Sequence, residues 1–278
     1  MNWTTFNLTM ENHIAHIQFN RPKELNSFSL ALWREFPLAI QDINQNKDMR
    51  VIVISSTGKH FTAGMDLSVF GSFEKSANEE AGRQNANFMG LVKKLQNTFT
   101  PLAQSKLPVI AAIQGGCIGA GLDLITACDL RYASQDAFFT LHEINIGMMA
   151  DVGTMPRLQH VVPAGIAREM AFTGKPLSAD RAERVGFLNG VVENYDTLIE
   201  EVMNVASLIA AKSPLAIWGS KEMMNYGDNH SIEDTLDRVA VWQAGMFSQS
   251  DVKTAIGAQQ QKQIPKFDKL LTEKKLAE

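Results

Sequence analysis

The sequence predicts an α/β protein that is rich in strands in its first half and helical in its second half. Two continuous apolar runs, Val51–Ser55 and Val109–Ile113, have the pattern of strands that are covered on both faces. Helical segments are expected between such runs, and this alternation is typical of a mostly parallel sheet. From Ala164 to Gln263 the apolar residues recur at helical spacing and prolines divide the segments, so this part is expected to be helical.

Local patterns predict the individual elements. His13–Phe19 alternates as a half-buried strand does, and Asp129–Ala133 is expected to be another strand. After Ser29, a residue suited to a helix N-cap, four apolar side chains recur at helical spacing: Leu30, Trp33, Phe36 and Ile40. The expected helices of the second half are Ala164–Thr173, Ala179–Val185, Leu198–Ala211, Leu215–Tyr226, Ile232–Phe247 and Val252–Gln263.

Composition narrows the classes of function. The chain has 278 residues, of which 45% are hydrophobic and 20% charged, and its net charge of −4 disfavours nucleic acid or an anionic membrane as the main partner. We find no run long enough to span a membrane and no signal peptide, so a cytoplasmic location is expected. Cys117 and Cys128 stand among apolar residues without metal-ligand spacing, which predicts buried thiols and no metal site.

Two turns rich in small residues follow predicted strands. They are His60–Leu67 (HFTAGMDL) and Gly115–Leu122 (GGCIGAGL). In a parallel sheet such turns lie side by side at the carboxyl ends of the strands, where ligands bind. Their backbone N–H groups could point at one oxygen atom, which is the requirement for an oxyanion hole. The alternative is that the glycines only permit tight turns and close helix packing.

Three carboxylates, Asp123, Glu143 and Asp151, follow the second turn among mostly apolar residues. Carboxylates are rarely buried without a partner or a chemical role, so the cluster is a candidate for acid–base chemistry. Helix capping is the alternative for Asp123 and for Asp151.

Other polar residues near these turns are expected to be structural. His60 and His142 each stand beside an apolar run, without an acidic partner at metal-ligand spacing. Asp129 and Arg131 are expected to form a pair with each other.

These motifs together resemble the crotonase superfamily, the enoyl-CoA hydratase/isomerase group of acyl-CoA enzymes. The resemblance runs from about His13 to Phe267 and rests on several strings in the right order: NRPKELNSFS, HFTAGMDL, IQGGCIGAGLDL, ACDLRYAS, FTLHEINIGMMADVGT and FTGKPLSADRAERVGFLNGVV. It implies an α/β fold in which a crotonase-like spiral of ββα units, residues 1–195, carries the acyl-CoA site. A C-terminal helical region, residues 196–278, would mediate a homotrimer or a dimer of trimers.

The resemblance also implies roles for residues in the two turns. The backbone N–H groups of Met65 and Ala120 would form the oxyanion hole, although family members often have glycine at the second position. The segment from Phe70 to Phe88 would line the acyl pocket. Coenzyme A would enter as part of a thioester substrate, and neither a cofactor nor a metal is implied. The implied substrate- and CoA-binding residues are Arg21, Lys23, Ala63, Gly64, Asp66, Leu67, Gly121, and, for a neighbouring subunit's pocket, Lys266 and Phe267.

The kind of reaction depends on the carboxylates. Hydratases of the family have glutamates at the positions of Asp123 and Glu143, whereas the Asp-Glu-Asp set resembles the Δ3,5-Δ2,4-dienoyl-CoA isomerase branch of fatty acid β-oxidation. By that resemblance Asp151 is the base at C2, Glu143 the acid at C6, and Asp123 orients or tunes both. At least one carboxyl pKa is expected to be raised by apolar neighbours, namely Ile146, Met148 and Met149.

Three alternatives stay open. Two are enzymes on the same scaffold, an enoyl-CoA hydratase and a Δ3-Δ2-enoyl-CoA isomerase. The third is a non-catalytic acyl-CoA-binding or RNA-binding member, which the acidic net charge and the intact carboxylate set disfavour.

Overall fold

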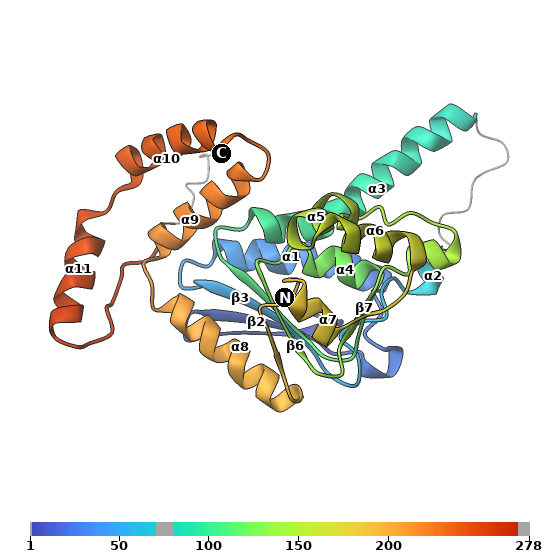
Figure 1. The fold of residues 1–278 in the computed structure, drawn as a ribbon, viewed down its shortest axis with the longest axis horizontal. Helices are drawn as coiled ribbons and strands as arrows, with labels where there is room; N and C mark the ends of the chain where they lie inside the picture. Colours follow the sequence, from blue (N-terminus) through green and yellow to red (C-terminus); the bar gives the residue numbers. More distant parts are fainter. Residues whose placement is uncertain (1, 71–79, 272–278) are drawn as a thin grey trace.

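The computed structural model describes residues 2–70 and 80–271, with a six-stranded sheet at its centre (Figure 1). The strand order is β1-β2-β3-β4-β6-β9; the first pair is antiparallel and all other neighbours are parallel. The predicted α/β class and the mostly parallel sheet are therefore confirmed. The strands are β1 (Phe6–Glu11), β2 (Ile14–Phe19), β3 (Val51–Ser56), β4 (Val109–Ile113), β6 (Leu130–Ser134) and β9 (Gly190–Val192).

A smaller second sheet lies beyond the ends of these strands. It consists of β5 (Gly116–Ile118), β7 (Phe138–Thr140) and β8 (Leu177–Ser178). Isolated bridges from Phe28 to Met65 and from Thr62 to Cys117 add the earlier turns to this layer. A strand of the large sheet is thus followed by an extended segment of the small layer and then by a helix, which is the ββα repeat that the resemblance implied.

The predicted helices occur where they were expected, with ends that differ by a few residues; the short helices at 22–24, 67–70, 143–146 and 154–161 were not predicted. They are η1 (Pro22–Glu24), α1 (Leu30–Gln45), α2 (Leu67–Phe70), α3 (Ala81–Gln104), α4 (Ala120–Ile125), η3 (Glu143–Ile146), α5 (Thr154–Val161), α6 (Ala164–Thr173), α7 (Ala179–Arg184), α8 (Tyr195–Ala210), α9 (Pro214–Gly227), α10 (Ile232–Met246) and α11 (Gln249–Gln260). Of the segment predicted to line the acyl pocket, residues 71–79 lie outside the described residues.

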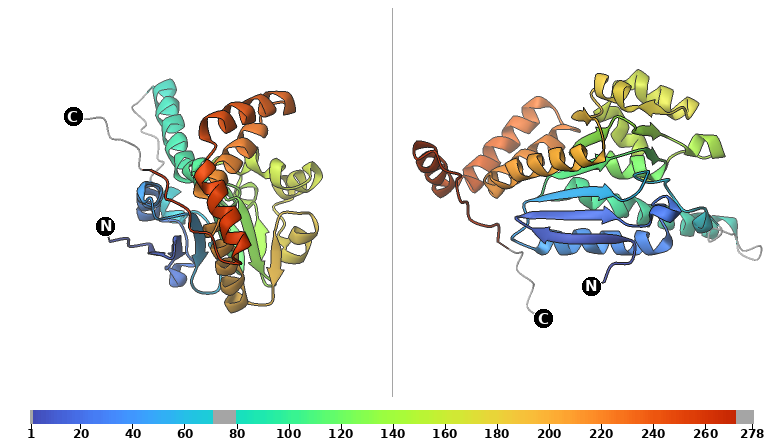
Figure 2. Two further views of the ribbon diagram at one scale, coloured as in Figure 1. Left: turned by 90° about the vertical axis from the view of Figure 1, so that its left-hand side faces the viewer. Right: turned by 90° about the horizontal axis from the view of Figure 1, so that it is seen from below.

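Helices cover both faces of the large sheet (Figure 2). On one face, Phe36 of α1, Phe99 of α3 and Leu122 of α4 belong to a large buried apolar cluster. On the other face, α8 packs on the strands, and its buried Leu198 and Val202 join a smaller cluster with strand residues. Burial on both faces explains why β3 and β4 read as continuous apolar runs.

The helix α1 begins as predicted, because the Ser29 hydroxyl accepts a hydrogen bond from the Leu32 N–H. Leu30 was expected on the buried face, and this expectation is wrong: Leu30 is 47% exposed, whereas Leu32 is 1% exposed. Leu30 is the first helical residue and points outside the stripe that starts with Leu32. Pro37 stands inside the helix, which continues to Gln45.

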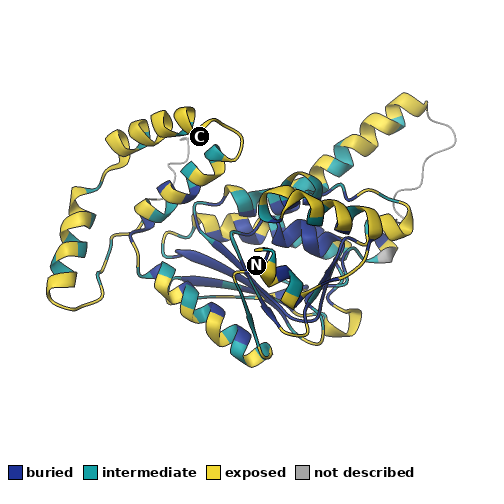
Figure 3. Ribbon diagram, in the orientation of Figure 1, coloured by how far each residue is buried: buried dark blue, intermediate teal, exposed yellow. Residues whose placement is uncertain are grey.

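The helices α10 and α11 extend away from the sheet, and their surfaces are largely exposed (Figure 3). Within the described ranges, neither α10 nor α11 contains a buried residue. No single described helix is long and apolar enough to cross a membrane; α8 and α9 pass that test only as a pair, across a bend of 105°. The division at residue 195 stays a prediction, and the described helix α8 after it packs on the sheet.

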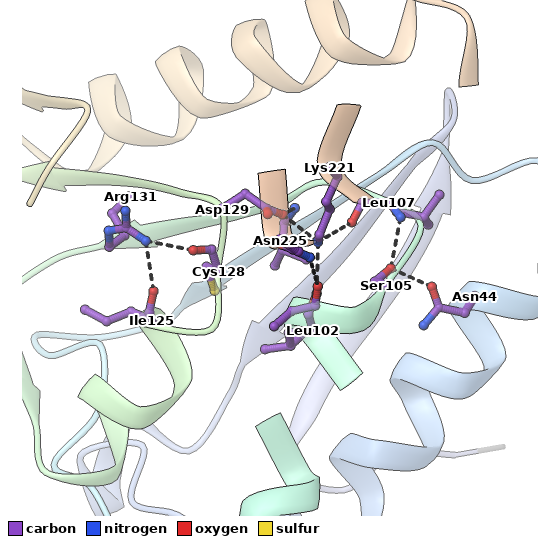
Figure 4. A network of polar contacts seen from close by, with 12 residues as sticks. Asn44, Leu102, Ser105, Leu107, Ile125, Cys128, Asp129, Arg131, Lys221 and Asn225 are labelled. Carbon is purple, nitrogen blue, oxygen red and sulfur yellow. Dashed lines mark hydrogen bonds and ion pairs between the residues drawn. The ribbon is translucent and has the colours of Figure 1, made fainter. Parts of the chain in front are cut away.

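A buried ion pair attaches α9 to the core (Figure 4). The Lys221 ammonium group lies 2.7 Å from Oδ2 of Asp129 and donates to the carbonyl oxygens of Leu102 and Leu107 at 3.0 Å. The expected pair of Asp129 with Arg131 is therefore wrong. Arg131 instead donates to backbone carbonyl oxygens, those of Ile125, Cys128 and Phe187.

Candidate active site

A cavity of about 920 Å³ opens where the two small-residue turns meet η3. The first turn contributes Ala63, Gly64 and Met65, and the second contributes Gly119 and Ala120. Glu143 lines the same cavity from η3. The structure thus brings both turns and one of the three carboxylates to one place, as the sheet argument predicted.

The backbone N–H groups of Met65 and Ala120 lack acceptors among the described residues. The bridge between Phe28 and Met65 does not use the Met65 N–H. Its two hydrogen bonds run from the Phe28 N–H to the Gly64 carbonyl oxygen and from the Asp66 N–H to the Phe28 carbonyl oxygen. Ala120 is the first residue of α4, where an amide has no partner within the helix. Two unpaired amides beside one cavity are the arrangement that an oxyanion hole needs.

Gly64 lets the two turns approach each other. Its φ of +87° suits glycine, and a Cβ atom there would lie 2.6 Å from the Ile118 carbonyl oxygen and 3.4 Å from the Ala120 nitrogen. The backbone nitrogens on either side of the cavity are therefore held close by a contact that a larger residue would prevent. Gly64 permits a tight turn and also brings the two turns together. The structural explanation for the glycines is therefore compatible with a catalytic role of the turns.

Glu143 is the carboxylate that faces the cavity. Its Oε2 atom is buried without a hydrogen-bond partner in the described structure, and Oε1 lies 3.1 Å from the position of a Cβ atom on Gly119. Burial raises the pKa of Glu143 to about 7, and the charges of Asp123 and Asp151 contribute to the rise. At neutral pH this side chain can therefore carry a proton and donate it.

The expected rise in a carboxyl pKa is found at Glu143, and burial is its main cause. Of the apolar neighbours named for it, Ile146 lines the same cavity, whereas Met149 is 67% exposed in the single chain. The Glu143 carboxylate also packs against the turn at Gly119.

Asp123 lies behind the cavity rather than in its wall. It is 1% exposed, and its Oδ1 atom accepts hydrogen bonds from the N–H and the hydroxyl group of Thr154, at 2.6 and 2.7 Å. The capping alternative is thus correct for Asp123, which caps α5 from a different helix. Burial raises the pKa of Asp123 to about 6 although the two Thr154 donors oppose the rise.

Asp151 is half-buried between η3 and α5. Burial raises the pKa of its carboxyl group, and its charge in turn raises the pKa of Glu143 and of Asp123. The Gln96 side chain of α3 donates a hydrogen bond of 2.7 Å to its carbonyl oxygen and fixes this part of the backbone. Asp151 does not cap α5, because Asp123 occupies that position.

Two residues of α5 that the sequence did not single out belong to this cluster. Thr154 binds Asp123, and Arg157 is the cation whose charge lowers the pKa of Asp123. The sequence signal for these two residues was their spacing of three positions, which puts both on one face of a helix. That helix begins three positions after Asp151.

The structure places only some of the predicted CoA-binding positions at the cavity. Lys23, Ala63, Gly64 and Asp66 line the cavity. Arg21 lies behind it, 4.0 Å from Asp66 and donating to the Ser27 carbonyl oxygen.

Gly121 lies inside the fold, because a Cβ atom there would meet Thr62 at 2.6 Å. Leu67 begins α2, and its side chain is outside what the structure describes. Phe267, next to Lys266, lines a different pocket among α9, α10 and α11, and its carbonyl oxygen accepts from Arg50. Within one chain these last two residues are therefore not at the site.

Among the described residues, neither His60 nor His142 has a carboxylate as a hydrogen-bond partner. His60 Nδ1 accepts a hydrogen bond of 2.8 Å from the Gly116 N–H, and this structural role agrees with the prediction. His142 is exposed at the cavity, 3.2 Å from the Asn145 amide nitrogen. Among the described residues no group of three His, Cys, Asp or Glu side chains could hold a metal ion.

The sequence pattern of the enoyl-CoA hydratase/isomerase family matches residues 9–269. The chain is 39% identical over 262 residues to the peroxisomal Δ3,5-Δ2,4-dienoyl-CoA isomerase of Arabidopsis thaliana, covering 94% of both chains. It is 37% identical to the mitochondrial enzyme of that name from Mus musculus, over 94% of this chain and 81% of the relative. An enoyl-CoA hydratase structure from Bacillus anthracis superposes with a TM-score of 0.84 at 28% identity, over 95% and 99% of the two chains.

These relatives overturn one expectation. The sequence predicted a cytoplasmic location, whereas the plant relative is named as peroxisomal and the mouse relative as mitochondrial. The sequence argument was wrong because it relied on the absence of recognisable address signals.

Proposed function

The chain belongs to the enoyl-CoA hydratase/isomerase family, and we propose that it converts 3,5-dienoyl-CoA to 2,4-dienoyl-CoA in fatty acid β-oxidation. The observation that carries this proposal is the division among the three carboxylates. Glu143 faces the cavity with a pKa of about 7, Asp151 is half-buried nearby, and Asp123 is engaged by Thr154. Relatives with the name Δ3,5-Δ2,4-dienoyl-CoA isomerase support the same reaction.

The substrate's thioester carbonyl binds between the Met65 and Ala120 amides. Removal of a proton next to the thioester moves negative charge onto this oxygen, and fixed N–H donors stabilise that charge. By analogy with other oxyanion holes each donor contributes about 3 kcal/mol. Coenzyme A is part of the substrate, and the proposal needs no further cofactor.

Two carboxyl groups then move protons at separate carbons. Asp151 removes the C2 proton, the electrons of that C–H bond enter the conjugated system, and the dienolate forms. The Glu143 carboxyl group delivers its proton to C6, so that both double bonds shift and the composition of the substrate is unchanged. A Glu143 pKa of about 7 suits an acid that arrives protonated at neutral pH.

The same geometry disfavours hydration. By resemblance, a hydratase holds its water between two carboxylates at the positions of Asp123 and Glu143. Here Asp123 is 1% exposed, and one of its oxygens accepts two hydrogen bonds from Thr154. Its Oδ1 atom is already engaged and cannot hold a water without giving up the cap of α5.

The CoA moiety lies across Lys23 and the first turn, with Arg21 held in place by Asp66.

Lys266 and Phe267 complete the pocket of a neighbouring subunit in a homotrimer or dimer of trimers. Exposed apolar residues on the last helices support this assembly, among them Ile232 (82%), Leu236 (62%) and Val241 (75%). Light scattering should give a particle of at least three 30.7 kDa chains.

The deciding experiment compares two substrates with the same enzyme. With 3,5-dienoyl-CoA the ultraviolet band of the conjugated 2,4-dienoyl product should appear, and crotonyl-CoA should be hydrated at least about 100-fold more slowly. Fast hydration of crotonyl-CoA without any diene shift would refute the proposal and favour the hydratase.

A further inference from the structure

A cation lies inside the carboxylate cluster without a full set of hydrogen-bond acceptors. Arg157, on α5, donates through Nη2 to the Thr100 hydroxyl of α3 at 3.1 Å. Its Nη1 is buried and has no acceptor in the described structure, and it packs so closely on Gly153 that a Cβ atom there would lie 2.0 Å away. Burying a cation in this way is costly unless a nearby anion compensates.

The compensating anion is the carboxylate of Asp123. Both side chains lie at the start of α5, because Nη1 of Arg157 packs on Gly153 and the N–H of the next residue, Thr154, donates to the Asp123 carboxylate. Their charges act on each other, because Arg157 lowers the pKa of Asp123 and Asp123 opposes the fall that burial causes in the pKa of Arg157.

Other titratable groups lie around Asp123 and Arg157 and interact with their charges. Asp151 acts on Asp123 from the segment before α5, and Glu143 on η3 responds to Asp123. Buried Cys117 of β5 and buried Cys128 after α4 complete the set. From α3 the facing side chains are uncharged, Thr100 and Gln96.

We propose that Arg157 is a positioning residue that keeps the transferable proton on Glu143, by stabilising the ionised form of Asp123. When two neighbouring carboxyl groups share one proton, the group with the stabilised anion gives it up to the other. Without Arg157 the proton would move partly to Asp123, which is buried behind the cavity and cannot reach the substrate. The inference rests on the proposed function for its catalytic consequence, but the position of the proton is a property of the free protein.

The first test uses turnover as a function of pH. An opposite charge shifts a carboxyl pKa by about 1 to 3 units, so Arg157→Met should lower kcat about tenfold near neutral pH. KM should change little, and Arg157→Lys should stay within about threefold of the original kcat. At acid pH both carboxyl groups are protonated whatever stands at position 157, so the ratio of the two kcat values should approach one. A ratio that is constant with pH would mean that Arg157 is only a structural brace.

Control variants separate charge from packing. Arg168→Met neutralises an exposed arginine on α6 and should change neither kcat nor its pH dependence. Thr100→Val removes the hydrogen bond to Arg157 and keeps the cation, so kcat should stay within about threefold. In an Asp123→Asn background the Arg157→Met substitution should have no further effect on kcat. An undiminished effect in that background, or an equal loss in Arg157→Lys, would overturn the proposal.

The second test needs no substrate and no Arg157 variant. Infrared spectra of the free protein at pH 7 should contain a protonated-carboxyl band that disappears in Glu143→Gln. A band that persists in Glu143→Gln would place the proton on another carboxyl group and overturn the inference. If the band behaves as expected but no diene shift is observed with 3,5-dienoyl-CoA, the proposed function fails while the position of the proton on Glu143 stands.

Discussion

The Oδ1 atom of Asp123 accepts two hydrogen bonds from Thr154, one from its N–H and one from its hydroxyl group, at 2.6 and 2.7 Å. A residue of α4 thereby caps α5, which begins three positions after Asp151. The backbone that carries Asp151 is thus tied to the turn that carries the Ala120 amide. The charge of Asp123 reaches Glu143, whose pKa it raises, although Asp123 is not in the cavity wall.

Asp123→Asn should retain the fold and shift the pH dependence of turnover. An asparagine oxygen can still accept from Thr154, so the cap of α5 is preserved. The negative charge is lost, however, and with it part of the rise in the Glu143 pKa. Glu143 then loses its proton at lower pH, so the alkaline limb of the kcat profile should move to lower pH, and kcat at neutral pH should fall about tenfold. An unchanged limb would show that Asp123 has no electrostatic role.

Glu143→Gln should lower kcat by about 100-fold or more, with a smaller change in KM, because the amide cannot donate a proton to the substrate. In the unsubstituted enzyme, kcat should decline as the pH rises through about 7, where Glu143 ionises. A pH profile measured on both proteins tests this. Asn145→Ala, a change on the same short helix, is a control for local disturbance. Full activity in Glu143→Gln would assign the acid to another residue.

The same substitution should also stabilise the protein at alkaline pH. The pKa of Glu143 rises from 4.5 to about 7 on folding, so its contribution to stability is fully present below pH 4.5 and is lost as the pH rises through about 7. Glu143→Gln removes that loss, which is on the order of 1 kcal/mol or more. The variant should therefore have a higher Tm than the original protein at pH 8 and a similar Tm near pH 4.5; equal Tm values at both pH values would contradict the raised pKa.

The sequence allowed prediction of those features that depend on nearby residues. The apolar runs of β3 and β4, the helix periods of the second half and the two small-residue turns all follow from neighbours along the chain. Partners that are far apart in sequence were missed. Asp129 binds Lys221, which is 92 residues away, rather than the adjacent Arg131.

The candidate site divides in the same way. Physical reasoning on the sequence identified the two turns and the three carboxylates, but it left capping open as an alternative to catalysis for Asp123 and Asp151. Thr154 identifies Asp123 as the residue that binds the start of α5, because only the folded chain brings its N–H and hydroxyl group to Asp123. The spacing of Arg157 from Thr154 was a weak signal, and it could not reveal the buried contact of Arg157 with Gly153 or the charge of Asp123.

Ala120→Pro should remove one donor of the oxyanion hole and leave the fold intact. Ala120 is the first residue of α4, a position where proline is well tolerated because its missing N–H has no partner within the helix. The loss of one donor should lower kcat about 100- to 1,000-fold. Gln249→Pro, at the first position of α11, is the matched control and should keep full activity. Equal kcat values in the two variants would exclude the Ala120 amide from catalysis.

Lys221→Met should destabilise the protein strongly without touching the cavity. The ammonium group is buried against Asp129, whose Oδ2 also accepts the Val109 N–H at 2.7 Å. Breaking a fully buried pair costs about 3 to 5 kcal/mol, and because water can reach Asp129, which is 28% exposed, the loss here should be about 2 to 3 kcal/mol, a fall in Tm on the order of 5 to 10 °C. Thermal unfolding measures this, with the exposed Lys212→Met as the control.

A double variant separates the interaction free energy of Lys221 with Asp129 from the destabilisation that an unpaired charge causes. Asp129→Asn keeps an oxygen for the Val109 N–H and leaves the Lys221 ammonium group without its anion. Lys221→Met combined with Asp129→Asn leaves neither charge buried alone, so the double variant should be less destabilised than the sum of the single variants by about 1 to 3 kcal/mol. Additive losses would mean that the two groups do not interact. In that case the carbonyl oxygens of Leu102 and Leu107 would be what attaches α9 to the core.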